Sequence, residues 1–292
     1  MAPLPFLGVG LNYHREIEPA LLDRPDRFDV LEVVTENIRH DPALPEGLRQ
    51  LMSDKPLVLH GVATSLGAAA PLEPGHLAQT LRTVARWRPV WFSDHIAYSR
   101  LGDRDLRQLL PVRRTPANLR RIVDKICRLQ EASAVPYLVE NITCYFDHAD
   151  EPIDEADFLN RILHQADCGL LLDLNNLHIN GCNHAFDPHE FLDRIDLDRV
   201  VEIHLAGGFM HDGLMIDSHG HRIDDAVWAL LRAVCKRADP RAVIIERDAN
   251  FDLEDIFGSI DQARRILGQD RAHDGAASPA APPVSGGSVP PG

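Results

Sequence analysis

Residues 169–187 read Gly-Leu-Leu-Leu-Asp-Leu-Asn-Asn-Leu-His-Ile-Asn-Gly-Cys-Asn-His-Ala-Phe-Asp, and this stretch holds the pattern that decides the fold. It opens with an apolar run, residues 170–172, of the kind that forms a strand buried on both faces. The run ends abruptly at Asp173, and Asn175 and Asn176 follow. A carboxylate and two amides at the end of a buried strand offer oxygen ligands to a cation. The alternative is an Asn-rich turn whose side chains hydrogen-bond the local backbone, and the rest of the chain has to decide.

Similar apolar runs alternate with longer amphipathic segments along the whole chain. The runs that we expect to be strands are 6–11, 29–34, 56–61, 90–95, 136–141, 169–173, 199–205 and 242–246. Segments with apolar residues at helical spacing are 76–88, 116–132, 154–166, 224–237 and 253–267. Pro116 and Pro188, each preceded by a capping residue, mark helix starts. Repeated strand-then-helix units predict an α/β fold, a single (β/α)8 TIM barrel.

The length and the composition both fit one barrel with a tail. The chain has 292 residues, and a TIM barrel typically takes about 250. We therefore expect a TIM-barrel catalytic domain over residues 1–270. Residues 271–292 are rich in Pro, Ala and Gly, a composition that cannot bury a core and that predicts a disordered tail.

The charge and the cysteines restrict the partners. Acidic residues outnumber basic ones by 44 to 30, which gives a formal net charge of −14. This excess argues against nucleic acid and anionic membranes as partners and favours a cation or a basic peptide. The five cysteines are scattered without a Cys-x-x-Cys pair, so neither a disulfide framework nor a thiolate zinc site is indicated. With no signal-peptide pattern and no apolar run of membrane-spanning length, we expect a cytoplasmic protein.

Six consecutive predicted strands end in a residue that can bind a metal ion. These strand-end residues are His60, Asp94 with His95, Glu140, Asp173, His204, and Glu246 with Asp248. The carboxyl ends of barrel strands meet at one rim, where TIM-barrel enzymes carry their active sites. An isolated histidine on an apolar strand is more often a hydrogen-bonded core residue than a ligand. Several histidines and carboxylates at one rim, however, would repel and desolvate one another unless cations lay among them. The strand ends therefore predict a metal cluster.

A further pair, Asp217 and His219, follows the seventh predicted strand. In an extended segment the Asp-x-His spacing places both side chains on one side, which suits chelation of one ion, although such pairs are also common on surfaces. The histidines expected on the surface or in loops are His14, His148, His164, His178, His184, His189, His211 and His221. Together with Asn176, Asp217 and His219 would form an additional metal position.

The candidate ligands leave the metal and the reaction open. Imidazole, carboxylate and amide ligands without thiolate fit iron, manganese or zinc. There are too many candidates for one ion, and their number suits two or three. One reaction is hydrolysis at a multi-zinc or manganese site of a phosphodiesterase or endonuclease-IV-like kind, and another is O₂-dependent oxidation at a multi-iron site. Nucleic-acid hydrolysis fits poorly with a net charge of −14. A third alternative is a non-catalytic scaffold, but structural metal sites use few ligands.

Six motifs lie at the predicted strand ends or shortly after them. They are Leu59-His60-Gly61-Val62, Ser93-Asp94-His95, Leu138-Val139-Glu140-Asn141, Leu172-Asp173-Leu174-Asn175-Asn176, Ile203-His204-Leu205-Ala206-Gly207 and Asp217-Ser218-His219-Gly220. In combination they resemble the multinuclear non-heme iron-dependent oxidative enzymes, and Gly208 and Glu246-Arg247-Asp248 are similar to the methanobactin-maturing branch. The resemblance implies a TIM-barrel enzyme that modifies a ribosomally synthesised precursor peptide, usually at cysteine, with iron and O₂. It also implies a small partner protein that recognises the leader of the precursor.

The same resemblance implies roles for the individual residues. Two or three iron ions, in mixed Fe(II) and Fe(III) states, would occupy the rim. The implied ligand sets are His60 and His95 for one ion, Asp173, His204 and Glu246 for a second, and Asn176, Asp217 and His219 for a third. Glu140 would bridge the first two ions. Asp94 and Asp248 would complete the catalytic set by orienting His95 and the metal-bound groups.

Overall fold

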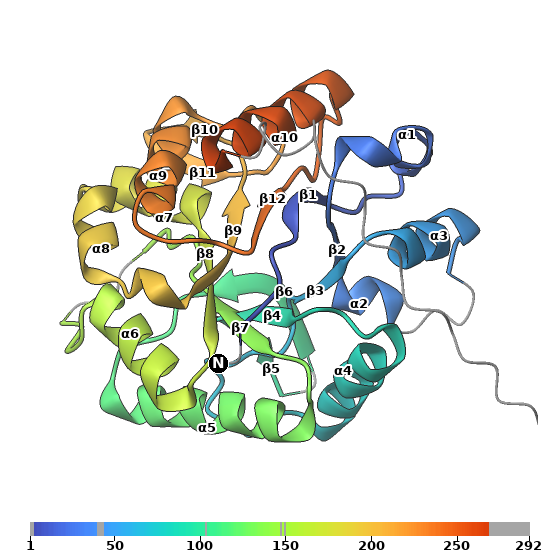
Figure 1. Ribbon diagram of the computed structural model, residues 1–292. Helices are drawn as coiled ribbons and strands as arrows, with labels where there is room; N and C mark the ends of the chain where they lie inside the picture. The colour runs from blue at the N-terminus through green and yellow to red at the C-terminus, as the bar shows by residue number, and fades with distance from the viewer. Residues whose placement is uncertain (1–2, 40–43, 103, 147, 149, 269–292) are drawn as a thin grey trace, which may run out of the picture.

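Eight parallel strands close into a barrel in the order β1-β12-β9-β8-β7-β4-β3-β2, and helices surround them (Figure 1). The computed structural model describes residues 3–39, 44–102, 104–146, 148 and 150–268. The barrel strands are β1 (Gly8–Asn12), β2 (Leu31–Val34), β3 (Leu57–Gly61), β4 (Phe92–His95), β7 (Tyr137–Glu140), β8 (Gly169–Asp173), β9 (Val200–Leu205) and β12 (Ala242–Ile245). Each overlaps a predicted strand, so the predicted TIM barrel is confirmed. The predicted tail, residues 271–292, lies outside the described residues.

The helices follow the amphipathic segments of the sequence. They are α1 (Glu18–Asp23), α2 (Thr35–Ile38), α3 (Glu46–Asp54), α4 (Pro74–Trp87), α5 (Pro116–Ala132), α6 (Glu155–Ala166), α7 (Leu174–His184), α8 (Pro188–Arg194), α9 (Asp225–Cys235) and α10 (Leu253–Leu267). Helix α5 begins where Thr115 accepts a hydrogen bond from the Asn118 backbone N–H, and it buries Ile122 and Ile126 against the barrel. Such a cap satisfies one of the free N–H groups at a helix start. Among the described helices, none combines the length and apolar character needed to cross a membrane.

Helix α7 was not predicted. The sequence left residues 174–184 as a loop or an Asn-rich turn, but the chain passes from β8 directly into a helix. Asp173 caps it by accepting a hydrogen bond of 2.6 Å from the Asn176 backbone N–H. The loop assignment of His178 and His184 was therefore wrong. Buried asparagines on this helix obscure the apolar periodicity that marks the other helices, because they make internal hydrogen bonds instead of facing water.

Two antiparallel hairpins at the mouth of the barrel were also not predicted. Strands β5 (Tyr98–Leu101) and β6 (Arg104–Leu110) form one hairpin after β4, and β10 (Gly208–His211) and β11 (Leu214–Asp217) form another after β9. The expectation that Asp217 and His219 lie in one extended segment was wrong, because Asp217 ends β11 and His219 has a left-handed backbone with φ of 48°. Short, largely exposed strands carry little of the apolar alternation from which strands are predicted.

The interior of the barrel changes character along each strand. Apolar side chains fill the lower part, and they include Val58, Leu138, Leu171 and Ile244, which we call the lower layer. Two residues further along the same four strands stand His60, Glu140, Asp173 and Glu246, which we call the upper layer. Side chains two residues apart in a strand share a face, so the upper layer also points into the barrel, at its carboxyl end. The parallel strand register therefore gathers these polar residues at one rim.

Candidate metal centre

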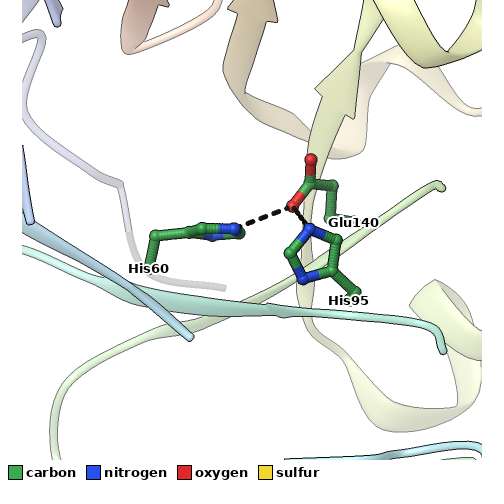
Figure 2. A group of neighbouring side chains, drawn as sticks. All are labelled: His60, His95 and Glu140. Atoms are coloured by element: carbon green, nitrogen blue, oxygen red, sulfur yellow. Dashed lines mark ion pairs between the residues drawn. The ribbon is translucent and has the colours of Figure 1, made fainter. Parts of the chain in front are cut away.

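Two histidines and one carboxylate meet at the ends of β3, β4 and β7. Both His60 Nε2 and His95 Nε2 point at the same oxygen of Glu140, Oε2, at 3.3 and 3.0 Å (Figure 2). All three side chains are buried. Their candidate ligand atoms lie within 4.8 Å of one another, a spacing that allows all three to reach one ion.

The second ring nitrogen of each of these histidines is held by a neutral group. His60 Nδ1 lies 2.8 Å from Ser93 Oγ, whose hydroxyl donates to the Leu59 carbonyl, so the imidazole N–H donates to Ser93. His95 Nδ1 donates to the Gly61 carbonyl at 3.2 Å. Each ring therefore directs its Nε2 at Glu140, and that nitrogen is the one left for a metal ion.

Asp94 supports the backbone around His95. Its Oδ1 accepts a hydrogen bond of 2.7 Å from the His95 backbone N–H, and its Oδ2 accepts one of 3.0 Å from the Thr64 backbone N–H. The distance from Asp94 Oδ1 to His95 Nδ1 is longer, 3.8 Å. Asp94 thus orders the chain on both sides of His95 and the loop after β3.

The other oxygen of Glu140 faces a second group. Its Oε1 lies 3.6 Å from His204 Nδ1, and Glu246 Oε2 lies 3.1 Å from the same nitrogen. Glu140, Asp173 and His204 form a buried set whose candidate ligand atoms lie within 4.8 Å of one another. Glu140 therefore stands between two clusters with one oxygen directed to each, the geometry that a bridging carboxylate needs.

His219 joins the second group to a third. Asp173, His219 and Glu246 form another set within 4.8 Å. His219 Nδ1 lies 3.6 Å from Glu246 Oε2 and 3.2 Å from Asp248 Oδ2, and its Nε2 lies 2.9 Å from Asp217 Oδ1. The sequence grouped His219 with Asn176 and Asp217, whereas here it also lies beside the carboxylates of the second group.

Thr143, which the sequence did not single out, links Asn176 to Asp217. Its hydroxyl donates a short hydrogen bond to Asn176 Oδ1 and lies 3.4 Å from Asp217 Oδ2. Asn175 Nδ2 donates to Asp217 Oδ1 at 3.0 Å. Asn176, Asp217 and His219 are thus close together at the start of α7 and the end of β11.

Asp248 connects the centre to β1. It accepts hydrogen bonds of 2.9 Å from Asn12 Nδ2 and 3.0 Å from His14 Nε2, while its other oxygen faces His219. His14 lies in the loop after β1, as expected, but its contact with Asp248 at the site was not predicted. The predicted first strand ends at residue 11, three positions before His14, so the strand-end pattern does not mark His14.

Two carboxylates below the rim were also missed. Glu32 Oε2 accepts a hydrogen bond of 3.0 Å from His204 Nε2, and Trp91 Nε1 donates to Glu202 Oε2 at 2.8 Å. Both glutamates lie inside strands and not at their ends. Their alternation with buried apolar residues, as in Val-Val-Glu-Ile before His204, was the available signal.

Burial and mutual proximity shift the pKa values of the rim residues. Burial raises the pKa of Glu140 to about 8 and that of Asp173 to about 7, despite nearby histidines. Burial lowers the pKa of His60 well below its usual value. For His95, burial acts in the same direction but is outweighed by Glu140 and Asp94, and the pKa rises to about 9. A bound cation would instead favour ionised carboxylates and neutral imidazoles.

Several rim atoms have no hydrogen-bond partner among the described residues. They are Glu140 Oε2, Asp173 Oδ2, His204 Nδ1 and both ring nitrogens of His219, all buried. Buried polar atoms are nearly always paired, so such a cluster requires an explanation. These atoms approach one another closely, as in the 3.0 Å between His95 Nε2 and Glu140 Oε2, without hydrogen-bond angles. Oxygen and nitrogen donors aimed at shared space fit two or three hard or borderline cations such as iron, manganese or zinc.

A pocket of about 460 Å³ opens above the centre. The rim residues form its floor, and its walls come from β6 and from the loop after β7. The wall residues are Asp105, Arg107, Gln108, Leu109, Thr143 and Tyr145. This volume lies in the range of sites that bind small molecules or a few residues of a peptide. The candidate metal centre is therefore open to a substrate from the mouth of the barrel.

The fold and this rim define a TIM-barrel enzyme with a candidate multinuclear metal centre. The chain belongs to the family of RiPP (ribosomally synthesised and post-translationally modified peptide) precursor modification enzymes MbnB/TglH/ChrH, whose family model matches residues 8–268. This match confirms the resemblance noted from the sequence motifs. A UPF0276 protein of Acaryochloris marina is 33% identical over 265 residues, which are 90% of this chain and 96% of that protein. A UPF0276 protein of Caulobacter vibrioides is 34% identical over 264 residues, 89% of this chain and 94% of its own.

Solved structures share the fold at low sequence identity. A D-psicose 3-epimerase has a TM-score of 0.59 at 15% identity, over 89% of this chain and 99% of that one. Endonuclease IV from Thermus thermophilus has a TM-score of 0.58 at 18% identity, over 90% of this chain and 99% of that one. Epimerases and a nuclease on one architecture illustrate that function follows from the site and not from the barrel.

Proposed function

We propose that this protein is an iron- and O₂-dependent oxidoreductase that modifies a ribosomally synthesised precursor peptide at a cysteine residue. The observation that carries the proposal is the convergence of buried, unpartnered oxygen and nitrogen atoms at the rim of a barrel that belongs to a RiPP-modifying family. A single structural ion would leave most of these donors without a ligand role, because a closed structural site uses about four.

The ligands of the proposed ions follow from the contacts at the rim. His60 and His95 would hold one iron ion, and Asp173, His204 and Glu246 a second. Glu140 would bridge them, which its two differently directed oxygens support. Asn176, Asp217 and His219 would hold a third ion. When bound, iron would supply one-electron chemistry with O₂ and a Lewis-acidic position for a substrate thiolate.

The protein's own residues would perform the remaining tasks. Hydrogen bonds at Nδ1 fix the rings of His60 and His95, so these side chains hold their positions before a substrate arrives. The pocket walls would position one cysteine of the peptide above Glu140 and limit the access of water. Asp248 would hold His219 in place through Asn12 and His14, at the edge of the pocket.

The mouth of the barrel would also receive the small leader-recognising partner. Large apolar side chains are exposed on its loops and hairpins: Leu101, Leu110, Tyr145, Phe146, Phe209, Met210 and Leu214. Apolar residues clustered around a functional opening are typical of protein or peptide interaction sites. We place the enzyme in the cytoplasm, where its cysteines, which form no disulfide among the described residues, would stay reduced.

Metal analysis tests the centre. After anaerobic purification, we expect two or three iron ions per chain and a Mössbauer spectrum with more than one iron site. His60→Gln should lose at least one ion, whereas His164→Gln should lose none, because His164 pairs with Asp196 on the surface. Zinc or manganese in place of iron, with cleavage of phosphodiesters, would identify the hydrolase alternative. One ion or none would identify the scaffold.

A peptide assay tests the reaction. Candidate precursor peptides are incubated with the iron-loaded enzyme, with and without O₂, and examined by tandem mass spectrometry. We expect an O₂-dependent mass change located at a cysteine and absent from the corresponding Cys→Ser peptide. A change that persists without O₂, or that lies on the serine variant as well, would contradict oxidation at cysteine.

A further inference from the structure

The three fully buried histidines of the centre are held from behind in two different ways. His60 and His95 donate from Nδ1 to neutral groups, the Ser93 hydroxyl and the Gly61 carbonyl. His204 is reversed: its Nδ1 faces the centre and its Nε2 contacts a carboxylate, Glu32 Oε2, at 3.0 Å. The second group of the centre therefore depends on a carboxyl group that is not itself at the rim.

The contact between Glu32 and His204 crosses the interior of the barrel. Glu32 lies on β2 and His204 on β9, and two strands, β1 and β12, separate them in the sheet order. Side-chain exposure is 1% for Glu32 and 0% for His204, so water does not compete for the hydrogen bond. A hydrogen bond to a carboxylate in such a dry setting is stronger than one between neutral groups.

A second carboxylate, Glu202, lies beside this pair. Glu32, Glu202 and His204 have atoms within 4.8 Å of one another, which would also suit a metal ion. The contacts favour another role. His204 Nε2 and Glu32 Oε2 already form a hydrogen bond, and Trp91 Nε1 donates a hydrogen bond of 2.8 Å to Glu202 Oε2. His204 Nε2, the nitrogen that an ion at this place would need, is already engaged by Glu32.

Packing alone does not account for Glu32. The barrel interior just below is apolar, as Leu138 and Leu171 show, and a buried carboxyl destabilises the fold unless it is fully paired. Glu32 Oε1 has no hydrogen-bond partner among the residues described. Within the described part of the chain, the partner of its Oε2 is His204. The contacts of Glu32 therefore indicate a role in holding His204.

We propose that Glu32 is a positioning residue that keeps a proton on His204 Nε2 and fixes the ring, so that Nδ1 faces Glu140 and Glu246 and is the nitrogen left for a metal ion. Because an imidazole with one proton can offer only one lone pair, the hydrogen bond at Nε2 decides which nitrogen is available. This inference deepens the proposed function, because it names Glu32 as the residue that prepares the second ion site. It rests on the proposed function only in what it says about metal binding.

The tautomer is measured directly on the full chain without metal. Long-range ¹H–¹⁵N spectra of ¹⁵N-histidine-labelled protein distinguish Nε2–H from Nδ1–H imidazoles, and His204→Asn identifies the resonance of His204. For His204 we expect a proton on Nε2, toward Glu32, together with a second proton on Nδ1 beside the Glu246 carboxylate, and for His60 the Nδ1–H tautomer. An Nδ1–H tautomer for His204 in the wild-type chain overturns the proposal, and this result needs no variant of Glu32 to fold.

Variants test the cause. In Glu32→Gln the amide can donate as well as accept, so we expect His204 to lose the proton from Nε2 in part of the molecules, with circular dichroism unchanged. Glu202→Gln is the matched control, a buried carboxyl of the same barrel interior whose partner is Trp91, and it should leave the protonation of His204 as in the wild type. Unchanged protonation of His204 in Glu32→Gln contradicts the proposal.

Metal binding gives a second readout, with Fe(II) alone as the probe under anaerobic conditions. Glu32→Gln should weaken one ion site roughly 10–100-fold, the usual effect of removing a partner behind a ligating histidine, and Glu202→Gln should not. Equal iron affinity in Glu32→Gln and wild type contradicts positioning. If the wild-type chain binds no iron, the proposed function fails, while the tautomer spectra still decide the role of Glu32.

Discussion

The lower and upper layers of the barrel interior occupy the same strands two residues apart, yet they are built on opposite principles. Leu138, Leu171 and the rest of the lower layer are buried hydrocarbon in close contact. Glu140 and Asp173 are equally buried but keep oxygens without hydrogen-bond partners among the described residues. The lower layer stabilises the barrel, and the upper layer uses that rigidity to hold donor atoms that would otherwise turn toward water. Changes in the two layers should therefore separate stability from activity.

The largest effect on activity should come from Glu140→Gln. Glutamine has nearly the same shape, but its NH₂ group cannot accept, so one of the two clusters loses its shared oxygen. We expect a folded barrel with fewer bound ions and a turnover about 10²–10³-fold lower, comparable to the loss of a main electrostatic group.

Glu131→Gln is the control, because Glu131 is an exposed residue near the end of α5 and does not belong to the rim. It should keep full turnover and full metal content. Full turnover in Glu140→Gln would exclude the bridging role.

The largest effect on stability should come from the lower layer, with Leu171→Ala. Leu171 is completely buried, and removing its side chain leaves a cavity in a barrel that cannot collapse. We expect the free energy of unfolding, measured with urea, to fall by about 2–5 kcal/mol. The ion content of the molecules that remain folded should be unchanged.

Leu214→Ala at the mouth removes the same atoms from a side chain that is 42% exposed. It should change the free energy of unfolding by no more than about 0.5 kcal/mol. Equal effects at both positions would remove the distinction between the packed layer and the mouth.

A smaller effect, of opposite sign, is expected from Glu202→Gln. Burial, aided by Glu32, raises the pKa of Glu202 from 4.5 to about 8. Between these values the folded chain binds a proton that the unfolded chain has released, so Glu202 lowers stability progressively as the pH rises through this window. The glutamine variant lacks this dependence. In the metal-free chain we expect it to be more stable than wild type at pH 7.5, by at least about 1 kcal/mol, with the difference vanishing near pH 4.

Urea unfolding at several pH values measures this difference. A variant that is less stable than wild type at pH 7.5 would mean that Glu202 is paired more completely than its contact with Trp91 indicates. In that case Glu202 would belong with the residues that stabilise the barrel, and the polar groups that serve function would begin closer to the rim than Glu202.

Much of the architecture was predictable because it depends on local patterns. Apolar runs of strand length recur at barrel spacing, and amphipathic segments such as α5 and α10 have the predicted bounds. Helix α7 was not predicted, because its buried asparagines break the apolar period. The two hairpins were not predicted, because their strands are short and exposed. The approximate position of the centre was predictable too, since most of the candidate ligands lie at or directly after the end of a barrel strand.

The sequence by itself determined that strands ending in His, Asp and Glu would form a barrel, because burial and strand periodicity act over a few residues. Only the tertiary structure decided which atoms meet. The two oxygens of Glu140 face different clusters, His14 reaches Asp248, and Glu32 crosses the barrel to His204. Such contacts join residues up to 234 positions apart, and their distances depend on the register and closure of the whole sheet. No local pattern carries that information.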